Sequence, residues 1–415
     1  MFVCKSRHPS DPICAINRSS FAVFLMNMSQ RVHDRPRRAR WKARIMAAQR
    51  RAMALLGRPI DPYPRARENL YLSPSQSHWA EMSAIHPQLS HIGAARGDIG
   101  EWQLEAREKL AELTGYSAST TIPEEMTWDA TTLSDGYYRT SYYLRVAPSR
   151  DVPVHIITRP ESKSPQRVMI CLHGTNSGAH LAWGEVRLPA DHERLARGAD
   201  FALQAVAQGW LAVVIEQSCF GERREKQLAK CSADPCIDAA NHALLLGRTL
   251  IGERASDISA VFNWLHADSE PKAPRGSPTV VLGHSSGGSA ALLAAALDPR
   301  LNGIVASGCV GYWSDTIMRR ADGGGQNIIP GILHWLEMDD VVGLCAPRPT
   351  LLISGTNDHI WPASGMVAVA DSTTEIFAAA GAKDRIRKIS VDGGHRFYPD
   401  ETWRGIAELF NNARS

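Results

Sequence analysis

The sequence lacks an apolar run long enough to cross a membrane, because no stretch approaches about 18 uninterrupted apolar residues. A secretory signal is not evident either, since the apolar run at 21–26 is short and precedes the arginine-rich stretch at 35–51. Internal repeats and low-complexity tracts are also missing. Together with 44% hydrophobic and 21% charged residues, these absences predict a globular protein of the cytoplasm.

The eight cysteines do not have the spacing of a small disulfide-stabilised domain. Cys171, Cys309 and Cys345 lie in or near apolar segments and are expected to be buried as small hydrophobic residues. Cys231 and Cys236 flank a polar loop, where a local disulfide and a pair of free thiols are both open interpretations. Too few other ligands lie near them to predict a zinc site, so neither a metal nor a cofactor is expected.

The small net charge of +3 conceals an uneven distribution along the chain. Residues 1–68 carry fifteen Lys/Arg against four Asp/Glu, a balance of +11, and the remainder is mildly acidic. The sequence predicts a basic N-terminal extension over 1–68, partly helical or disordered, and a catalytic domain over 69–415. A basic amphipathic helix at 41–56 that binds an anionic surface is the alternative. We do not expect a nucleic-acid partner.

One pentapeptide, Gly283-His284-Ser285-Ser286-Gly287, carries most of the functional information. It follows an apolar run, 278–282, and precedes a helix of small residues, 289–297. A strand, a sharp turn and a helix are the context that a G-x-S-x-G nucleophile elbow requires. We therefore expect Ser285 to be a nucleophile at the end of a strand.

A nucleophilic serine needs a base and an acid that orients the base. Asp358 follows an apolar strand at 349–355, and His395 follows the next strand, 386–391. The order Ser285, Asp358, His395 is that of α/β-hydrolases, and it differs from the orders of chymotrypsin and subtilisin. Asp392, three residues before His395, is the alternative acid.

The oxyanion of an acyl-transfer reaction needs two preorganised donors. An apolar strand at 168–172 ends in His173-Gly174-Thr175. In the α/β-hydrolase fold, an H-G turn at this place supplies one backbone N–H, and the residue after the nucleophile supplies the other. Thr175 and Ser286 are therefore the expected donors, with Gly174 as the alternative to Thr175.

From about Trp102 onward, the chain resembles the α/β-hydrolase superfamily, and within it the acetyl xylan esterase and dienelactone hydrolase-like bacterial esterases. The resemblance rests on five short sequence segments: His173-Gly174-Thr175, Phe220-Gly221-Glu222-Arg223, Gly283 to Gly288, Ala346-Pro347-Arg348-Pro349 and Gly394-His395. Dienelactone hydrolases have a cysteine nucleophile where this chain has Ser285, which favours ester hydrolysis over lactone chemistry. Cephalosporin and xylan deacetylases typically have glutamine where this chain has Ser286.

The order of segments predicts an α/β fold. A hairpin at 137–158 is followed by alternating strands and helices, which implies a mostly parallel central sheet flanked by helices. The predicted helices cover 101–113, 191–207 and 244–265. All the proposed catalytic residues fall at the carboxyl ends of strands, where such sheets bind ligands.

A longer segment, 309–349, separates the sixth expected strand from the seventh. It is interpreted either as a cap-like excursion that lines a substrate pocket or as a packed excursion that completes the core. For the pocket we expect five residues: His173, His284, Trp313, Trp335 and Trp361.

These patterns predict a serine carboxylic-ester hydrolase that forms an acyl-enzyme intermediate on a small or medium ester. A serine peptidase or amidase with the same triad is one alternative. A non-catalytic binding protein with the same fold is another, because a fold by itself does not determine function. The expected partner is a small-molecule ester, and a homo-oligomer remains open.

Overall fold

The computed structural model describes residues 70–94, 97–159, 165–319 and 325–411. The chain divides into two units, 1–77 and 78–415, and the architecture given below is that of the second unit. The predicted basic extension, 1–68, and its helix at 41–56 lie outside the described residues. Within the described residues, no helix combines the length and the apolar character needed to span a bilayer.

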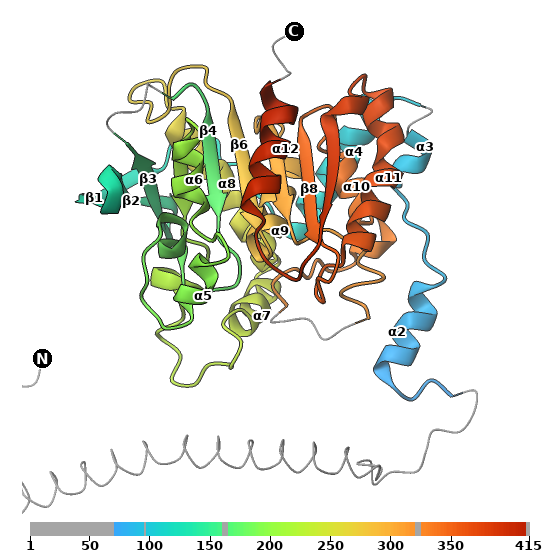
Figure 1. The fold of residues 1–415 in the computed structure, drawn as a ribbon. Coiled ribbons are helices and arrows are strands. Elements are labelled where there is room, and N and C mark those ends of the chain that lie inside the picture. Colours follow the sequence, from blue (N-terminus) through green and yellow to red (C-terminus); the bar gives the residue numbers. More distant parts are fainter. Residues whose placement is uncertain (1–69, 95–96, 160–164, 320–324, 412–415) are drawn as a thin grey trace, which may run out of the picture. The chain divides into compact units, whose positions relative to one another are not determined.

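A single nine-stranded sheet forms the centre of this unit (Figure 1). The strands lie in the order β1-β2-β3-β5-β4-β6-β7-β8-β9. The first three strands are antiparallel to their neighbours, and all pairs from β5 through β9 are parallel. The strand bounds are β1 Glu124–Thr132, β2 Tyr138–Ala147, β3 Arg150–Thr158, β4 Val168–Leu172, β5 Leu211–Ile215, β6 Thr279–His284, β7 Gly303–Ser307, β8 Thr350–Gly355 and β9 Ile386–Val391.

Helices cover both faces of the sheet. The helices of the described residues are, in sequence order, α2 Pro74–Met82, which spans the boundary between the two units and has no buried residue, α3 His91–Ala94, α4 Ile99–Thr114, α5 Asp191–Leu195, α6 Phe201–Ala207, α7 Ile237–Leu245, α8 Leu250–Leu265, α9 Ser286–Leu297, α10 Met338–Gly343, α11 Ala363–Ala379 and α12 Pro399–Asn411. Short 3-10 helices lie at Ser134–Gly136, Ala179–Trp183, Gly221–Arg223, Ile332–His334 and Lys383–Arg385.

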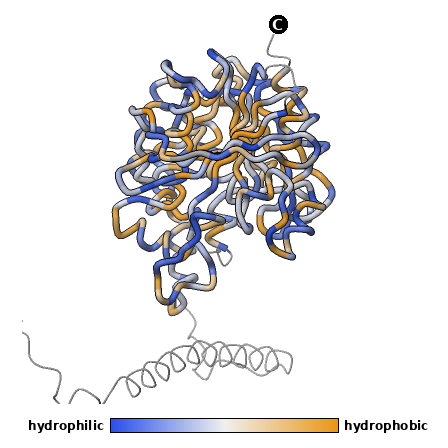
Figure 2. Tube along the Cα trace, turned by 90° about the vertical axis from the view of Figure 1, so that its left-hand side faces the viewer, coloured by the Kyte–Doolittle hydropathy of each residue, from blue (hydrophilic) through white to orange (hydrophobic). Residues whose placement is uncertain are grey.

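The alternation of side chains along the strands gives two hydrophobic cores. In β4, Ile170 and Leu172 pack into one core with α4, α8, α9 and α11, whereas Met169 and Cys171 pack into the other with α6 and α12. This two-sided burial explains why the central strands are continuously apolar instead of alternating with polar residues. Figure 2 shows hydrophobic segments gathered toward the middle of the body.

The structure confirms the predicted α/β fold with a mostly parallel sheet and flanking helices. Two predicted helices are each divided. The helix expected at 191–207 is α5 and α6, separated by Gly198 with φ 80°, and the one at 244–265 begins as α7 and resumes as α8 after Gly247 with φ 72°. Strand β1 was not predicted from the sequence, and it pairs with β2 at the sheet edge.

The excursion between β7 and β8 belongs to the main core. Its apolar residues Trp313, Ile329, Ile332, Leu336 and Met338 are buried in the same cluster as α8 and α9. The described part of 309–349 therefore helps to complete the core, and some of its residues also line two cavities.

The two cysteines of the polar loop are not joined. Cys231 is exposed, and Cys236 is buried with Cys219 and Phe220 in a small separate cluster. The Cys236 thiol accepts a hydrogen bond from Arg254 Nη2 at 3.5 Å. All six described cysteines are free thiols.

Candidate active site

Ser285 lies at the sharp turn between β6 and α9. Its backbone has φ 56° and ψ −126°, a conformation that a residue with a side chain rarely adopts. The Ser285 N–H donates to the Ser307 carbonyl at 2.8 Å, which ties the turn to the neighbouring strand β7. The turn therefore has the strained geometry of a nucleophile elbow.

The glycines of the motif are required by close backbone approaches. A Cβ at Gly283 would lie 2.2 Å from the Gly287 carbonyl oxygen. A Cβ at Gly287 would lie 2.2 Å from the Leu172 carbonyl oxygen at the end of β4. Neither clash is with a flexible side chain, so glycine at 283 lets the turn close tightly, and glycine at 287 lets the start of α9 pack against β4.

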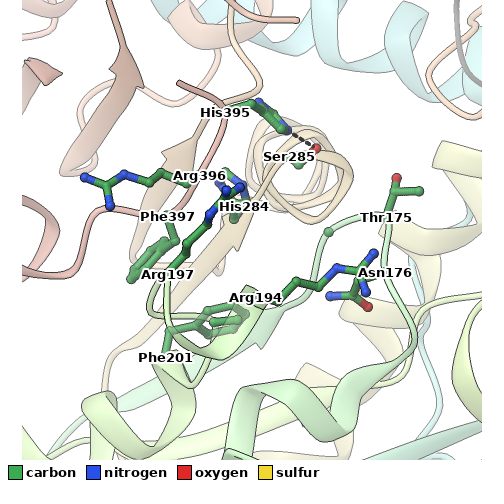
Figure 3. Close-up of a pocket in the computed structure, with 12 residues that line it drawn as sticks. Thr175, Asn176, Arg194, Arg197, Phe201, His284, Ser285, His395, Arg396 and Phe397 are labelled. Carbon is green, nitrogen blue, oxygen red and sulfur yellow. Dashed lines mark hydrogen bonds between the residues drawn. The ribbon is translucent and has the colours of Figure 1, made fainter. Parts of the chain in front are cut away.

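His395 connects the serine to an acid, and Figure 3 shows its hydrogen bond to Ser285. Its Nε2 lies 2.9 Å from Ser285 Oγ, and its Nδ1 lies 2.7 Å from Asp358 Oδ2. The three residues come from the loops after β6, β8 and β9, which end at one edge of the sheet. The structure thus brings together the three residues that the sequence singled out.

Asp358 is held in place by two further hydrogen bonds besides its contact with His395. Its Oδ1 accepts hydrogen bonds from the backbone N–H groups of Ile360 at 2.8 Å and Trp361 at 2.9 Å. Burial by itself would raise the pKa of Asp358, but the His395 contact and these two N–H groups outweigh it and lower the pKa below its usual value. The side chain is therefore a carboxylate that can orient Nδ1–H of His395.

Asp392, the alternative acid, is hydrogen-bonded to the loop after β8, whereas His395 is hydrogen-bonded to Asp358. Its carboxylate is exposed and accepts hydrogen bonds from Thr356 Oγ1 at 3.3 Å and Asn357 Nδ2 at 3.2 Å. These contacts link the loop after β9 to the loop after β8. Asp392 therefore supports the loop that carries Asp358, while Asp358 itself contacts the histidine.

The two expected oxyanion donors lie beside the serine. A Cβ at Gly174 would be 3.1 Å from Ser285 Cβ, so the loop after β4 passes directly against the elbow. Thr175 Oγ1 donates to Ser286 Oγ at 3.3 Å, which joins this loop to the first residue of α9. The N–H groups at the start of a helix have no partner within the helix, so that of Ser286 is available for an anion.

Gln326 was missed by sequence reasoning, although it touches the oxyanion loop. Its Nε2 donates to Thr175 Oγ1 at 3.1 Å, and its Oε1 accepts from Arg254 Nη1 at 3.0 Å. The side chain is buried, with 8% of its surface exposed. Gln326 lies in the excursion between β7 and β8, 151 residues from Thr175, and no local pattern indicates such a long-range contact.

His284 packs behind the serine. Its Nδ1 is hydrogen-bonded to Ser307 Oγ at 3.1 Å, and its ring centre lies 5.0 Å from that of His395. Burial, reinforced by the neighbouring His395, lowers the pKa of His284 to about 3. At neutral pH His284 is uncharged and does not compete with His395 as a base.

A cavity of about 190 Å³ opens at Ser285. The loop after β4, the segment from α5 to α6 and the loop after β9 surround it (Figure 3). Its lining residues are Gly174, Thr175, Asn176, Arg194, Arg197, Ala199, Phe201, His284, Ser285, His395, Arg396 and Phe397.

Only His284 of the five predicted pocket residues lines this cavity. His173 is 1% exposed and its Nε2 lies 2.9 Å from Glu216 Oε1, so it fixes the loop after β4 from beneath. Trp313 and Trp361 line a separate small cavity, and Trp335 packs under the Lys109 ammonium at 4.2 Å. These four residues therefore lie outside the cavity at Ser285, because apolar composition along the chain does not distinguish the wall of one cavity from another or from the core.

Among the described residues, one group has the spacing of a metal site, formed by His91, Asp339 and Asp340. Its members already stabilise the fold. His91 Nδ1 lies 2.7 Å from Asp340 Oδ1, and Asp339 Oδ2 accepts from Ser372 Oγ at 2.7 Å. The group lies outside the cavity at Ser285 and takes no part in its geometry.

The sequence pattern of the Abhydrolase family matches residues 79–361, which is most of the chain. The chain belongs to the Abhydrolase family. Among curated proteins, the "Putative hydrolase YtaP" of Bacillus subtilis (strain 168) is 24% identical over 246 residues, covering 59% of this chain and 77% of that protein.

Solved structures share the fold of this α/β-hydrolase. A "putative acetyl xylan esterase" from Bacteroides fragilis NCTC 9343 superposes with a TM-score of 0.63 at 16% identity, covering 84% of this chain and 96% of that one. A glucuronoyl esterase from Teredinibacter turnerae T7901 superposes with a TM-score of 0.56 at 18% identity, covering 88% of this chain and 98% of that one.

Proposed function

We propose that this α/β-hydrolase is a serine carboxylic-ester hydrolase. Ser285 Oγ attacks the acyl carbon while His395 Nε2 accepts its proton, and Asp358 holds the imidazole and stabilises its cation. The N–H groups of Thr175 and Ser286 bind the oxyanion. The protonated histidine then releases the alcohol, and water activated by the same Nε2 hydrolyses the acyl-enzyme.

The observation that carries this proposal is the 2.9 Å contact between His395 Nε2 and Ser285 Oγ at a strained elbow. A binding protein would have no need to maintain that strain together with a hydrogen-bonded base and acid. Solved relatives of the same fold include proteins described as acetyl xylan, glucuronoyl and methyl esterases, which supports an ester as substrate.

Hydrolysis of p-nitrophenyl acetate and butyrate, compared with aminoacyl anilides, tests the proposal. We expect turnover of the esters, labelling of Ser285 by a fluorophosphonate, and loss of both in Ser285→Ala. His395→Ala should lose nearly as much activity, because the two residues act as one unit. Ser289→Ala, one helical turn further along α9, is the matched control and should retain both.

Faster cleavage of the anilides would identify a peptidase or amidase. A folded wild-type protein that neither turns over esters nor reacts with the fluorophosphonate would contradict the enzymatic proposal altogether.

A further inference from the structure

The charge of the cavity at Ser285 is one-sided. Three arginines line it, Arg194, Arg197 and Arg396, and its lining contains no aspartate or glutamate. In Figure 3, Arg194 extends toward Asn176 and Arg197 toward His284, whereas Arg396 points away from Ser285. Two guanidinium groups on the segment from α5 to α6 therefore lie over the approach to the serine.

Arg194 has an acidic neighbour, Asp191, whose carboxylate already accepts hydrogen bonds from four other donors. Asp191 is fully buried and accepts from Ser177 Oγ at 2.5 Å, His180 Nε2 at 3.0 Å and the backbone N–H groups of residues 187 and 188. Arg194 Nη1 is 3.4 Å away, the longest of these contacts. The donors that hold Asp191 do not depend on Arg194, so the guanidinium can turn to a ligand at little cost.

Arg197 has a partner that is easily exchanged. Its Nη2 donates to Glu193 Oε1 at 2.6 Å, four residues earlier in the chain. The two side chains are 53% and 67% exposed. An exposed pair of this kind contributes little to stability, whereas the carboxylate of a ligand can form two parallel hydrogen bonds with a guanidinium. An anionic ligand can therefore replace Glu193.

Two aromatic residues, Phe201 and Phe397, form part of the cavity wall. The rings of Phe201 and Phe397 have centres 5.4 Å apart, and both side chains are about 3% exposed. The cavity thus offers an apolar surface beside two cationic groups. A neutral alkyl ester would use only the apolar surface and would leave both guanidinium groups to solvent.

We propose that the preferred substrate is an ester that also carries a carboxylate, bound by Arg194 and Arg197 while its scissile carbonyl lies at Ser285. The apolar chain between the two groups contacts Phe201 and Phe397. This inference rests on the proposed ester hydrolysis and names the substrate class of that site.

A pair of esters of equal length isolates the contribution of the anion. The p-nitrophenyl monoester of adipic acid ends in a carboxylate, and p-nitrophenyl hexanoate ends in a methyl group at the same position. We expect kcat/KM to be about tenfold higher for the adipate monoester, a gain that decreases as sodium chloride is added because exposed charge pairs are screened.

Single substitutions locate that preference. Arg194→Gln and Arg197→Gln should each lower kcat/KM for the adipate monoester by about five- to tenfold, and for the hexanoate by less than about twofold. Glu193→Gln should raise the rate with the adipate monoester, because it removes the competitor of Arg197. Arg404→Gln, an exposed arginine of α12, is the matched control and should change neither rate.

Equal rates for the two esters, or arginine variants that slow both esters alike, would overturn the anionic preference. Binding to Ser285→Ala separates this outcome from a failure of the proposed function. Calorimetry should show that monomethyl adipate binds this variant more tightly than methyl hexanoate does, and that Arg197→Gln in the same background removes the difference. Absence of turnover with both esters would count against ester hydrolysis, whereas equal binding would count against the carboxylate site.

Discussion

At the scale of single residues, the three side chains of the candidate triad have different surroundings. Ser285 is held by a strained backbone, His395 by its two hydrogen bonds, and Asp358 by two backbone N–H groups. The acid therefore has hydrogen bonds to both of its carboxylate oxygens. Its carboxylate fixes the tautomer in which His395 Nε2 is free to accept the serine proton.

Asp358→Asn should lower kcat by orders of magnitude, on the order of 10⁴ as in the best-known triad, because an amide can favour the wrong tautomer of His395. Asp392→Asn is the matched control and should lower kcat less than about threefold. Steady-state kinetics with p-nitrophenyl butyrate measures both. A greater loss in Asp392→Asn would mean that the acid assignment is wrong.

At the scale of elements, the site depends on how closely α9 packs against β4. The start of α9 lies against the Leu172 carbonyl, and the loop that follows β4 carries Gly174 and Thr175. Any displacement of β4 by α9 therefore displaces one oxyanion donor relative to the other. Gln326 fixes the same loop from the excursion between β7 and β8.

Gly287→Ala should consequently damage activity more than stability. Its Cβ would overlap the Leu172 and His173 carbonyl oxygens, at 2.2 and 2.5 Å. Relief of the overlap moves the oxyanion loop, so we expect a loss of at least about 100-fold in kcat/KM. We expect a cost in unfolding free energy of about 1–3 kcal/mol.

Gly365→Ala in α11 is the control for this prediction. Its Cβ would make an ordinary contact of 3.5 Å with Gly311 Cα, so activity should be unchanged and stability equal or slightly higher. Chemical denaturation and ester kinetics on the two variants provide the comparison. Normal kcat/KM in Gly287→Ala would show that the oxyanion loop tolerates the shift.

At the scale of the whole molecule, buried neutral histidines make the fold sensitive to acid. His155 is 3% exposed, its Nδ1 is hydrogen-bonded to Ser141 Oγ at 2.9 Å, and its ring packs on Trp183. Burial lowers the pKa of His155 from 6.5 to about 4. Between about pH 6.5 and pH 4, His155 is therefore protonated in the unfolded chain and neutral in the folded protein. Because the unfolded state binds more protons in this range, the free energy of unfolding falls as the pH drops toward 4.

His155 should by itself remove about 2 kcal/mol of unfolding free energy between pH 7 and pH 5. A glutamine side chain does not titrate, so His155→Gln should lose about 2 kcal/mol less unfolding free energy than wild type between pH 7 and pH 5. His192→Gln, at an exposed position of α5, should leave the pH dependence unchanged. Urea unfolding at both pH values measures this loss. An equal loss of unfolding free energy in wild type and His155→Gln would refute the assignment.

The basic N-terminal region gives a further prediction at this scale. The candidate site residues all lie between 173 and 397, and the first 27 residues contain no long periodic apolar pattern. A variant that begins at Met28 should therefore keep kcat/KM within about threefold of the full chain. A folded Met28 variant without activity would show that the first residues help to build the pocket.

The sequence was sufficient for the features that depend on local chemistry. The alternation of expected strands and helices along the chain indicated a mostly parallel sheet. The glycines around Ser285 indicated the elbow, because only a residue without a side chain tolerates such close backbone contacts. Asp358 and His395 were identifiable because residues after parallel strands meet at one edge of the sheet. These inferences needed only periodicity, spacing and the order of elements.

The tertiary structure decided what depends on contacts between distant segments. Whether 309–349 forms a cap or completes the core is set by the side chains packed on it, and both outcomes have the same apolar composition. The link from Gln326 to Thr175 and the arginines over Ser285 likewise follow from folding that joins segments far apart in the chain. A sequence pattern reports the neighbours along the chain, whereas a pocket is defined by neighbours in space.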